Sequence, residues 1–85
     1  ARMKIMATLY VLDDADFTFL LKQTGLTRGN LSSHLSKLED AGYVDVTKTY
    51  AGKRPLTILK LSRAGRKAFD DYRESLTNLA GNLPR

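Results

Sequence analysis

Apolar residues recur at helical spacing near the start of the chain, in two runs separated by a polar turn. The first predicted helix covers residues 2–12, and its apolar face consists of Ile5, Met6, Ala7, Leu9 and Leu12. Residues 13–16 are mostly acidic and form the turn, from which the Asp16 carboxylate can cap a second helix over 17–23. The inward side chains of that short helix are Phe17, Leu20 and Leu21. The pattern therefore predicts two amphipathic helices at the start of the fold.

A third apolar run predicts the helix around which the rest of the chain is arranged, over residues 27–41. Its apolar face is formed at i, i+4 and i+7 by Leu31, Leu35 and Leu38. Thr27 is the expected N-cap, and Gly42 is placed to end the helix in a left-handed conformation. The opposite face carries the small or polar residues Gly29, Asn30, Ser33, Ser36 and Lys37. Side chains of these types bond base edges and phosphates.

The short turn over 23–26 joins the second and third helices into a predicted helix-turn-helix. In that motif the second helix enters the major groove of DNA while the first crosses the backbone. An ordinary amphipathic helix in an all-α core would have the same apolar face. The rest of the chain must therefore distinguish this alternative from a DNA-binding helix-turn-helix.

After Gly42 the apolar period changes from 3.6 to 2, which predicts a β-hairpin. Val44, Val46 and Lys48 alternate with polar or aromatic neighbours, and residues 56–61 form the returning strand. The turn over 51–55 carries two basic residues. Because an isolated hairpin is only marginally stable, it is expected to pack on the helices. A helix-turn-helix followed by such a hairpin is the winged-helix arrangement, with the hairpin as the wing.

The last predicted helix begins at residue 63, is capped by Ser62 and ends near residue 82. Its apolar positions are spaced 3, 4, 3 and 4 residues apart, in the heptad pattern Phe69, Tyr72, Leu76, Leu79 and Leu83. The first part of this stripe is expected to pack on its own domain. The later part overhangs a small core and needs a partner to cover it. We therefore expect a homodimer through residues 63–83, with parallel and antiparallel pairings both compatible.

Composition narrows the possible functions. Eighty-five residues support a single domain, residues 1–85, with one small core. The chain has no cysteine and a single histidine, His34, so we expect no metal site, no cofactor and no enzymatic activity. No apolar run approaches the roughly 20 residues of a membrane span, and no secretory signal is visible, so a cytoplasmic protein without membrane contact is expected.

The charge distribution points to an anionic partner. The formal net charge is +5, and every charged residue between 46 and 67 is basic: Lys48, Lys53, Arg54, Lys60, Arg63, Arg66 and Lys67. A stretch of one sign beside a helix-turn-helix is typical of a surface that binds phosphates.

Three segments, residues 29–35, 38–44 and 61–66, read GNLSSHL, LEDAGYV and LSRAGR. In this order and spacing they resemble MarR/ArsR-type winged-helix transcriptional regulators, especially a compact bacterial and archaeal subgroup, over nearly the whole chain. The resemblance implies an α+β fold, mostly α: a winged helix-turn-helix with a two-stranded wing and a long C-terminal helix. The metal-sensing cysteines of ArsR-type members are absent here. The longer flanking helices of full MarR-type proteins are absent too, so no small-molecule effector is expected.

The resemblance also implies that Arg28, Asn30, Ser32, Ser33 and His34 face DNA, with Lys53 and Arg54 at the wing tip. Together with the outward-facing residues identified above, the candidate DNA-binding residues are Arg28, Gly29, Asn30, Ser32, Ser33, His34, Ser36, Lys37, Lys48, Tyr50, Lys53 and Arg54. Four of these residues also have possible roles that involve no DNA. Gly29 could simply be tolerated in the first helical turn, and His34 could form a hydrogen bond to a neighbouring residue. Tyr50 could belong to a cross-strand pair, and Arg54 could be a solvated charge in the turn.

The sequence thus predicts a homodimeric regulator that binds specific sequences of double-stranded DNA, with the helix over 27–41 in the major groove. The basic wing over 50–55 is expected on the minor groove or the backbone. The alternative is a winged-helix module that binds another protein or RNA without specific DNA binding.

Overall fold

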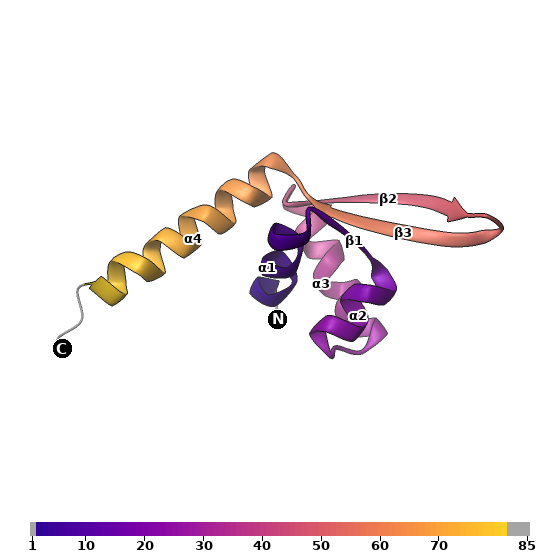
Figure 1. The fold of residues 1–85 in the computed structure, drawn as a ribbon, viewed down its shortest axis with the longest axis horizontal. Coiled ribbons are helices and arrows are strands. Elements are labelled where there is room, and N and C mark those ends of the chain that lie inside the picture. The colour runs from indigo at the N-terminus through magenta and orange to yellow at the C-terminus, as the bar shows by residue number, and fades with distance from the viewer. Residues whose placement is uncertain (1, 82–85) are drawn as a thin grey trace.

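The computed structural model describes residues 2–81, which form four helices and a three-stranded antiparallel sheet (Figure 1). The elements in chain order are α1 (Arg2–Leu12), β1 (Asp14–Asp16), α2 (Phe17–Thr24), α3 (Arg28–Asp40), β2 (Val44–Ala51), β3 (Arg54–Leu61) and α4 (Arg63–Gly81). Helices α1, α2 and α3 gather at the base of the sheet, while the β2–β3 hairpin and α4 project in opposite directions (Figure 1). This arrangement confirms the predicted winged helix-turn-helix and accounts for the elongated shape, 56 × 25 × 20 Å.

The core follows the apolar faces that the sequence predicts. Its buried side chains are Ile5, Met6, Leu9, Ala15, Leu20, Leu31, Leu35, Leu38, Val44, Leu59 and Leu61. Burying an aliphatic side chain of this kind contributes about 1.5–3 kcal/mol, so these contacts hold α3 against the sheet. Leu12 was expected in this core and is 43% exposed. It is the last residue of α1, beyond which Asp13 turns the chain with a φ of 64°.

The acidic turn predicted over residues 13–16 is instead the short strand β1. It pairs antiparallel with β3, Asp14 opposite Lys60 and Asp16 opposite Ile58, so the strand order is β1-β3-β2. Only Ala15 of this strand is buried. Two acids around one alanine carry no strand signature. The pairing with a distant strand makes this segment extended.

Local capping sets the limits of α2 and α3 as predicted. The Asp16 carboxylate accepts a hydrogen bond from the Phe19 amide at 2.7 Å, and the Thr27 hydroxyl accepts one from the Asn30 amide at 3.1 Å. Gly42 follows α3 with a φ of 80°, a conformation that glycine adopts without strain. These caps fix both ends of the third helix.

The start of α4 is tied to the turn between α3 and β2. The Ser62 hydroxyl accepts from the Gly65 amide at 3.0 Å and donates to the Gly42 carbonyl, while the Ser62 amide donates to the Tyr43 carbonyl at 3.0 Å. Ser62 is therefore the predicted cap of α4 and also a link to the end of α3. From Asp71 to Leu79, every side chain of α4 is exposed.

Candidate nucleic-acid interface

Helix α3 separates its apolar and polar residues as its sequence predicts. Leu31, Leu35 and Leu38 are buried. Apart from His34, the other residues of α3 are exposed, and they include the candidates Arg28, Gly29, Asn30, Ser32, Ser33, Ser36 and Lys37 as well as the acidic Glu39 and Asp40. His34 lies at the boundary, half-buried, and within residues 2–81 its Nδ1 has no hydrogen-bond partner. The outer face of α3 thus presents hydroxyl, amide and ammonium groups on a helix whose side chains are mostly small.

A groove runs between α3 and the wing, and we call it the helix–wing groove. It encloses about 380 Å³, between Ser32, Ser36 and Glu39 of α3 and Lys48 and Thr57 of the hairpin. Lys48 reaches this groove because it shares a face of β2 with Val44 and Val46, and side chains alternate between the two faces of a strand.

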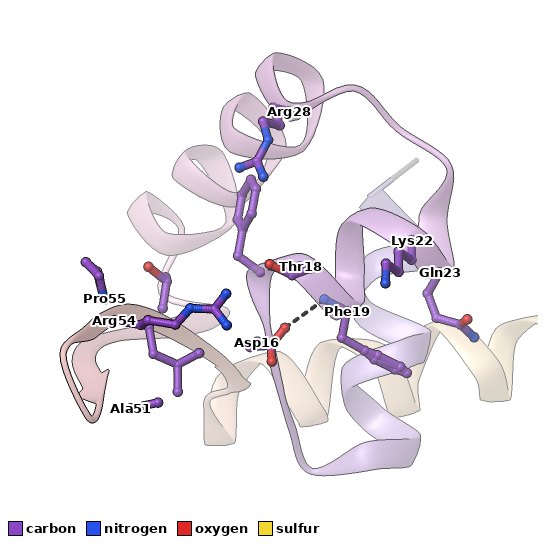
Figure 2. Close-up of a pocket in the computed structure, with 12 residues that line it drawn as sticks. Asp16, Thr18, Phe19, Lys22, Gln23, Arg28, Ala51, Arg54 and Pro55 are labelled. Carbon is purple, nitrogen blue, oxygen red and sulfur yellow. Dashed lines mark hydrogen bonds between the residues drawn. The ribbon is translucent and has the colours of Figure 1, made fainter.

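A second groove, the tip groove, lies between α2 and the end of the wing, and encloses about 740 Å³. It adjoins the helix–wing groove, since Phe17 and Thr57 line both. Arg28 and Arg54 reach into it from opposite sides (Figure 2). The Arg28 guanidinium lies 5.7 Å from the centre of the Phe17 ring, a cation–π contact that holds it at the groove wall.

The wing places its remaining candidate residues at its far end. Lys53 lies in the turn between the strands, Arg54 stands opposite Ala51, and Tyr50 stands opposite Pro55. Tyr50 is 71% exposed, so its ring is largely open to solvent despite the cross-strand neighbour. The tip is therefore a projecting basic and aromatic surface.

The basic residues of α3 and the wing differ in ion pairing from three of those on α4. Among residues 2–81 the ion pairs are Arg66 with Asp13 at 2.8 Å, Lys67 with Asp71 at 3.0 Å and Arg73 with Asp70 at 3.5 Å. All of them involve α4. Within the same part of the chain, none of the basic residues of α3 and the wing forms an ion pair: Arg28, Lys37, Lys48, Lys53 and Arg54. Two carboxylates line the grooves beside them, Asp16 in the tip groove and Glu39 in the helix–wing groove.

Sequence reasoning missed several residues that line these grooves, among them Thr18, Lys22, Glu39 and Thr57. Thr57 could have been predicted from the sequence, because a hairpin with a two-residue turn at 52 and 53 places it opposite Lys48. Thr18 lies in the first turn of α2, the helix that crosses the backbone in a helix-turn-helix. Lys22 and Glu39 carry no sequence signal that separates them from solvated charges.

The residues predicted for the dimer interface divide along α4. Phe69 is half-buried and packs 5.0 Å from the Tyr10 ring of its own domain. Tyr72, Leu76 and Leu79 are 40%, 48% and 61% exposed. Leu83 lies outside the described residues. The later part of the stripe is thus open to solvent in the single chain, as its sequence position predicts.

The family model for winged helix DNA-binding domains matches residues 1–80. The chain belongs to this family. Family and fold indicate a DNA-binding regulator rather than an enzyme. In the same part of the chain that the structure describes, no helix is both long and apolar enough to cross a membrane.

Similar proteins agree with this assignment. An uncharacterised protein of Methanocaldococcus jannaschii is 40% identical over 82 residues, which cover 96% of this winged-helix chain and 89% of that protein. The structure of a transcriptional regulator homologue from Pyrococcus horikoshii matches with a TM-score of 0.91 and 32% identity, over 99% of this chain and 83% of that one. A mutant Escherichia coli MarR complexed with operator DNA shares the fold, with a TM-score of 0.74 and 20% identity, over 82% of this chain and 49% of that one. The winged helix is therefore of the kind found in MarR-family transcriptional regulators.

Proposed function

We propose that this protein is a cytoplasmic, homodimeric transcriptional regulator that binds specific sequences of double-stranded DNA. In this proposal α3 occupies the major groove and the wing lies on the minor groove or the backbone. The observation that carries it is a cluster of exposed basic residues without ion pairs on α3 and the wing. Among residues 2–81, Lys37, Lys48 and Arg54 form no ion pair with a carboxylate. Lys37 lies on the outer polar face of α3, and Lys48 and Arg54 lie on the wing beside it.

The two grooves explain how such a surface would hold a duplex. When α3 enters the major groove and the wing reaches the neighbouring minor groove, the phosphate strand between them passes over the helix–wing groove. Arg28, Lys48 and Arg54 border its path, and Ser32 and Thr57 supply hydroxyl donors. Glu39 lies in the same groove and repels phosphates, so the backbone is expected nearer the Arg28 end.

Sequence preference is assigned to the outer face of α3. Gly29 and Ser33 add little bulk, which lets the helix backbone approach the base edges closely. Asn30, Ser33 and Lys37 carry groups that bond bases in the major groove. Arg54 at the wing tip suits the narrow, electronegative minor groove of A·T-rich DNA.

A second copy of the chain is the proposed cover for Tyr72, Leu76 and Leu79. A two-fold axis brings the same stripe of each protomer together, which buries both. The pair would present its two recognition helices to half-sites about 10 base pairs apart. The Escherichia coli MarR of the same fold is complexed with operator DNA, which supports a DNA-bound role for this fold.

The proposal predicts duplex binding that weakens steeply with salt. Each neutralised phosphate contributes about −0.9 to the slope of log affinity against log salt. Lys48→Ala and Arg54→Ala should each reduce the steepness by about 1, because both side chains border the phosphate path. The matched control is Lys67→Ala, which removes the same charge from α4, where Lys67 pairs with Asp71, and should leave the slope unchanged. Fluorescence anisotropy over a salt series measures all four proteins.

A flat salt response of the unmodified protein, or equal slopes for Arg54→Ala and Lys67→Ala, would contradict DNA binding through this surface. Tight binding to single-stranded RNA or to a protein partner, with no duplex binding at low salt, would instead support the interaction-module alternative.

A further inference from the structure

Helix α4 is held to its domain by polar contacts at two places along its first half. The first is its N-terminus, where Ser62 bonds Gly42 and Tyr43 and the buried Gly65 lies against the Tyr43 carbonyl. The second is one α1 side chain, Tyr10, whose sequence position is 60 residues from its partner on α4.

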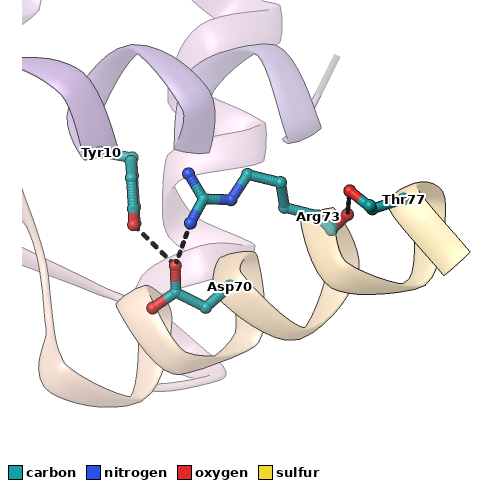
Figure 3. A network of polar contacts seen from close by, with 4 residues as sticks. All are labelled: Tyr10, Asp70, Arg73 and Thr77. Carbon is teal, nitrogen blue, oxygen red and sulfur yellow. Dashed lines mark hydrogen bonds and ion pairs between the residues drawn. The ribbon is translucent and has the colours of Figure 1, made fainter.

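Tyr10 contacts α4 across two successive turns (Figure 3). Its hydroxyl donates to Asp70 Oδ1 at 2.6 Å, and Arg73 Nη2 lies 3.5 Å from the same oxygen. Two guanidinium groups lie close to its ring, with Arg66 5.4 Å and Arg73 5.3 Å from the ring centre. Phe69 packs on the same ring at 5.0 Å. We call this group of residues the Tyr10 clamp.

The chemistry of the clamp favours a directional joint. A phenol donating to a carboxylate is a short, charge-assisted hydrogen bond, stronger and more oriented than a neutral one. The hydrogen bond to Asp70, and then burial, raise the pKa of the Tyr10 hydroxyl, so it stays protonated and able to donate across the neutral range. Arg66 extends the joint to the end of α1 through its 2.8 Å pair with Asp13.

Two separated anchors fix the direction of a rod, whereas one anchor leaves a pivot. From Gly65 to Leu79, α4 spans ~21 Å at 1.5 Å per residue. A swing of roughly 10° about the first anchor would move the far end by roughly 4 Å by that geometry, close to the ~3.4 Å rise of one base pair. The exposed apolar stripe lies on this far half. Its angle to the domain therefore controls how far apart two paired domains stand.

We propose that the Tyr10 clamp is the positioning device that sets the half-site spacing recognised by the dimer. The inference rests on the proposed function, since spacing has meaning only for paired recognition helices. Tyr10 and Asp70 act through α4 and touch no DNA. Losing their hydrogen bond leaves only the packing of Phe69 and the Arg66–Asp13 pair at this joint, which are less directional. The angle of α4 then varies more widely, so the dimer accepts several spacings with similar affinity.

The first readout of the test is the angle itself, measured without DNA. The chain has no cysteine, so Thr47→Cys and Asn78→Cys introduce the only two labelling sites, both at exposed positions outside the clamp and the DNA-facing surface. Pulsed electron spin resonance on labelled protein diluted with unlabelled protein gives the distance distribution within one chain. Tyr10→Phe keeps the ring and removes the hydroxyl, and Asp70→Ala removes the acceptor. The matched control, Asp71→Ala, removes the neighbouring carboxylate, whose partner Lys67 is on α4 itself.

The second readout is the affinity for duplexes whose half-sites are one base pair closer or further apart than the preferred spacing. For the unmodified protein and Asp71→Ala, we expect a narrow distance distribution and a spacing penalty of roughly tenfold, the size of one mismatched base pair. For Tyr10→Phe and Asp70→Ala, the distribution should broaden about twofold as more orientations are populated. The penalty should then fall to roughly threefold or less, below that of one mismatch.

An unchanged distance distribution in both clamp variants overturns the inference, whatever the DNA results. A broadened distribution with an unchanged spacing penalty also overturns it, because the clamp would then hold α4 without setting the spacing. An unmodified protein with no spacing penalty contradicts the proposed dimer on DNA and the inference with it. The distance distribution is measured without DNA and within one chain. It therefore distinguishes a protein that lacks the proposed dimer on DNA from one in which Tyr10 and Asp70 do not hold the angle of α4.

Discussion

At the scale of single residues, Gly65 shows most clearly what this fold requires. A Cβ at this position would lie 2.1 Å from the Tyr43 carbonyl oxygen and 3.1 Å from Leu61 Cδ2. The oxygen belongs to the backbone and cannot move aside as a flexible side chain would. Glycine is therefore needed here for close approach between α4 and the turn after α3.

Gly65→Ala is expected to destabilise the protein. Overpacking against a fixed backbone typically costs about 1–3 kcal/mol, more than the helix propensity of alanine returns. The matched control is Gly29→Ala, another first-turn helical glycine with no atom within 4 Å of an added Cβ. That change should stabilise by up to about 1 kcal/mol. Chemical denaturation gives the free energy of unfolding of both variants. Equal stability of Gly65→Ala and the unmodified protein would contradict the close approach of α4 to the Tyr43 carbonyl.

The features that could be predicted from sequence at this scale are local. Asp16, Thr27 and Ser62 cap helices that begin within three residues of them, so sequence neighbours reveal their role. The Tyr10–Asp70 hydrogen bond and the contact of Gly65 with Tyr43 join residues far apart in sequence. Nothing in a periodic pattern indicates which distant residues will meet.

At the scale of elements, the four helices and the hairpin follow from apolar period, whereas β1 does not. A helix of eight or more residues repeats its signal over several turns, and the hairpin repeats its alternation along both strands. The three residues of β1 contain no repeat, and their extended form depends on pairing with β3. The same dependence on tertiary contact explains why Leu12, although in phase, ended outside the core.

The grooves were also beyond sequence reasoning at this scale. The candidate residues of α3 and the wing could be chosen by type and spacing, but the packing of α2, α3 and the hairpin determines which of them share a wall. Phe17 illustrates this, because it packs against the core as expected and also lines both grooves beside Arg28.

The element-scale prediction concerns the exposed stripe of α4. Leu76→Glu combined with Leu79→Glu should give a folded monomer, since these side chains are 48% and 61% exposed in the single chain. In a dimer seam the added charges would be buried without partners, at a cost of several kcal/mol. The matched control, Ser75→Glu with Asn78→Glu, adds the same charge beside the stripe. Sedimentation velocity checks both: a double leucine variant that remains a dimer would show that α4 is not the interface.

At the scale of the whole molecule, charge and shape divide the protein into two ends. At the α4 end, Arg66 pairs with Asp13 and links α4 to the residue after α1, whereas Lys67 and Arg73 pair with Asp71 and Asp70 within α4 itself. On α3 and the wing, the basic side chains have no such partners among residues 2–81 and surround the two grooves. This division fits one end that assembles with a second copy and another that meets an anionic duplex.

The most direct test of this account is selection of bound sequences from a pool of random duplex DNA with the purified protein. The account predicts two inverted half-sites with centres about 10 base pairs apart. Repeating the selection with Ser33→Ala and Lys37→Ala should relax the preferred base at single positions, each worth about 1–3 kcal/mol. Selection that enriches no sequence, or the same sequence regardless of Ser33 and Lys37, would contradict specific recognition by α3.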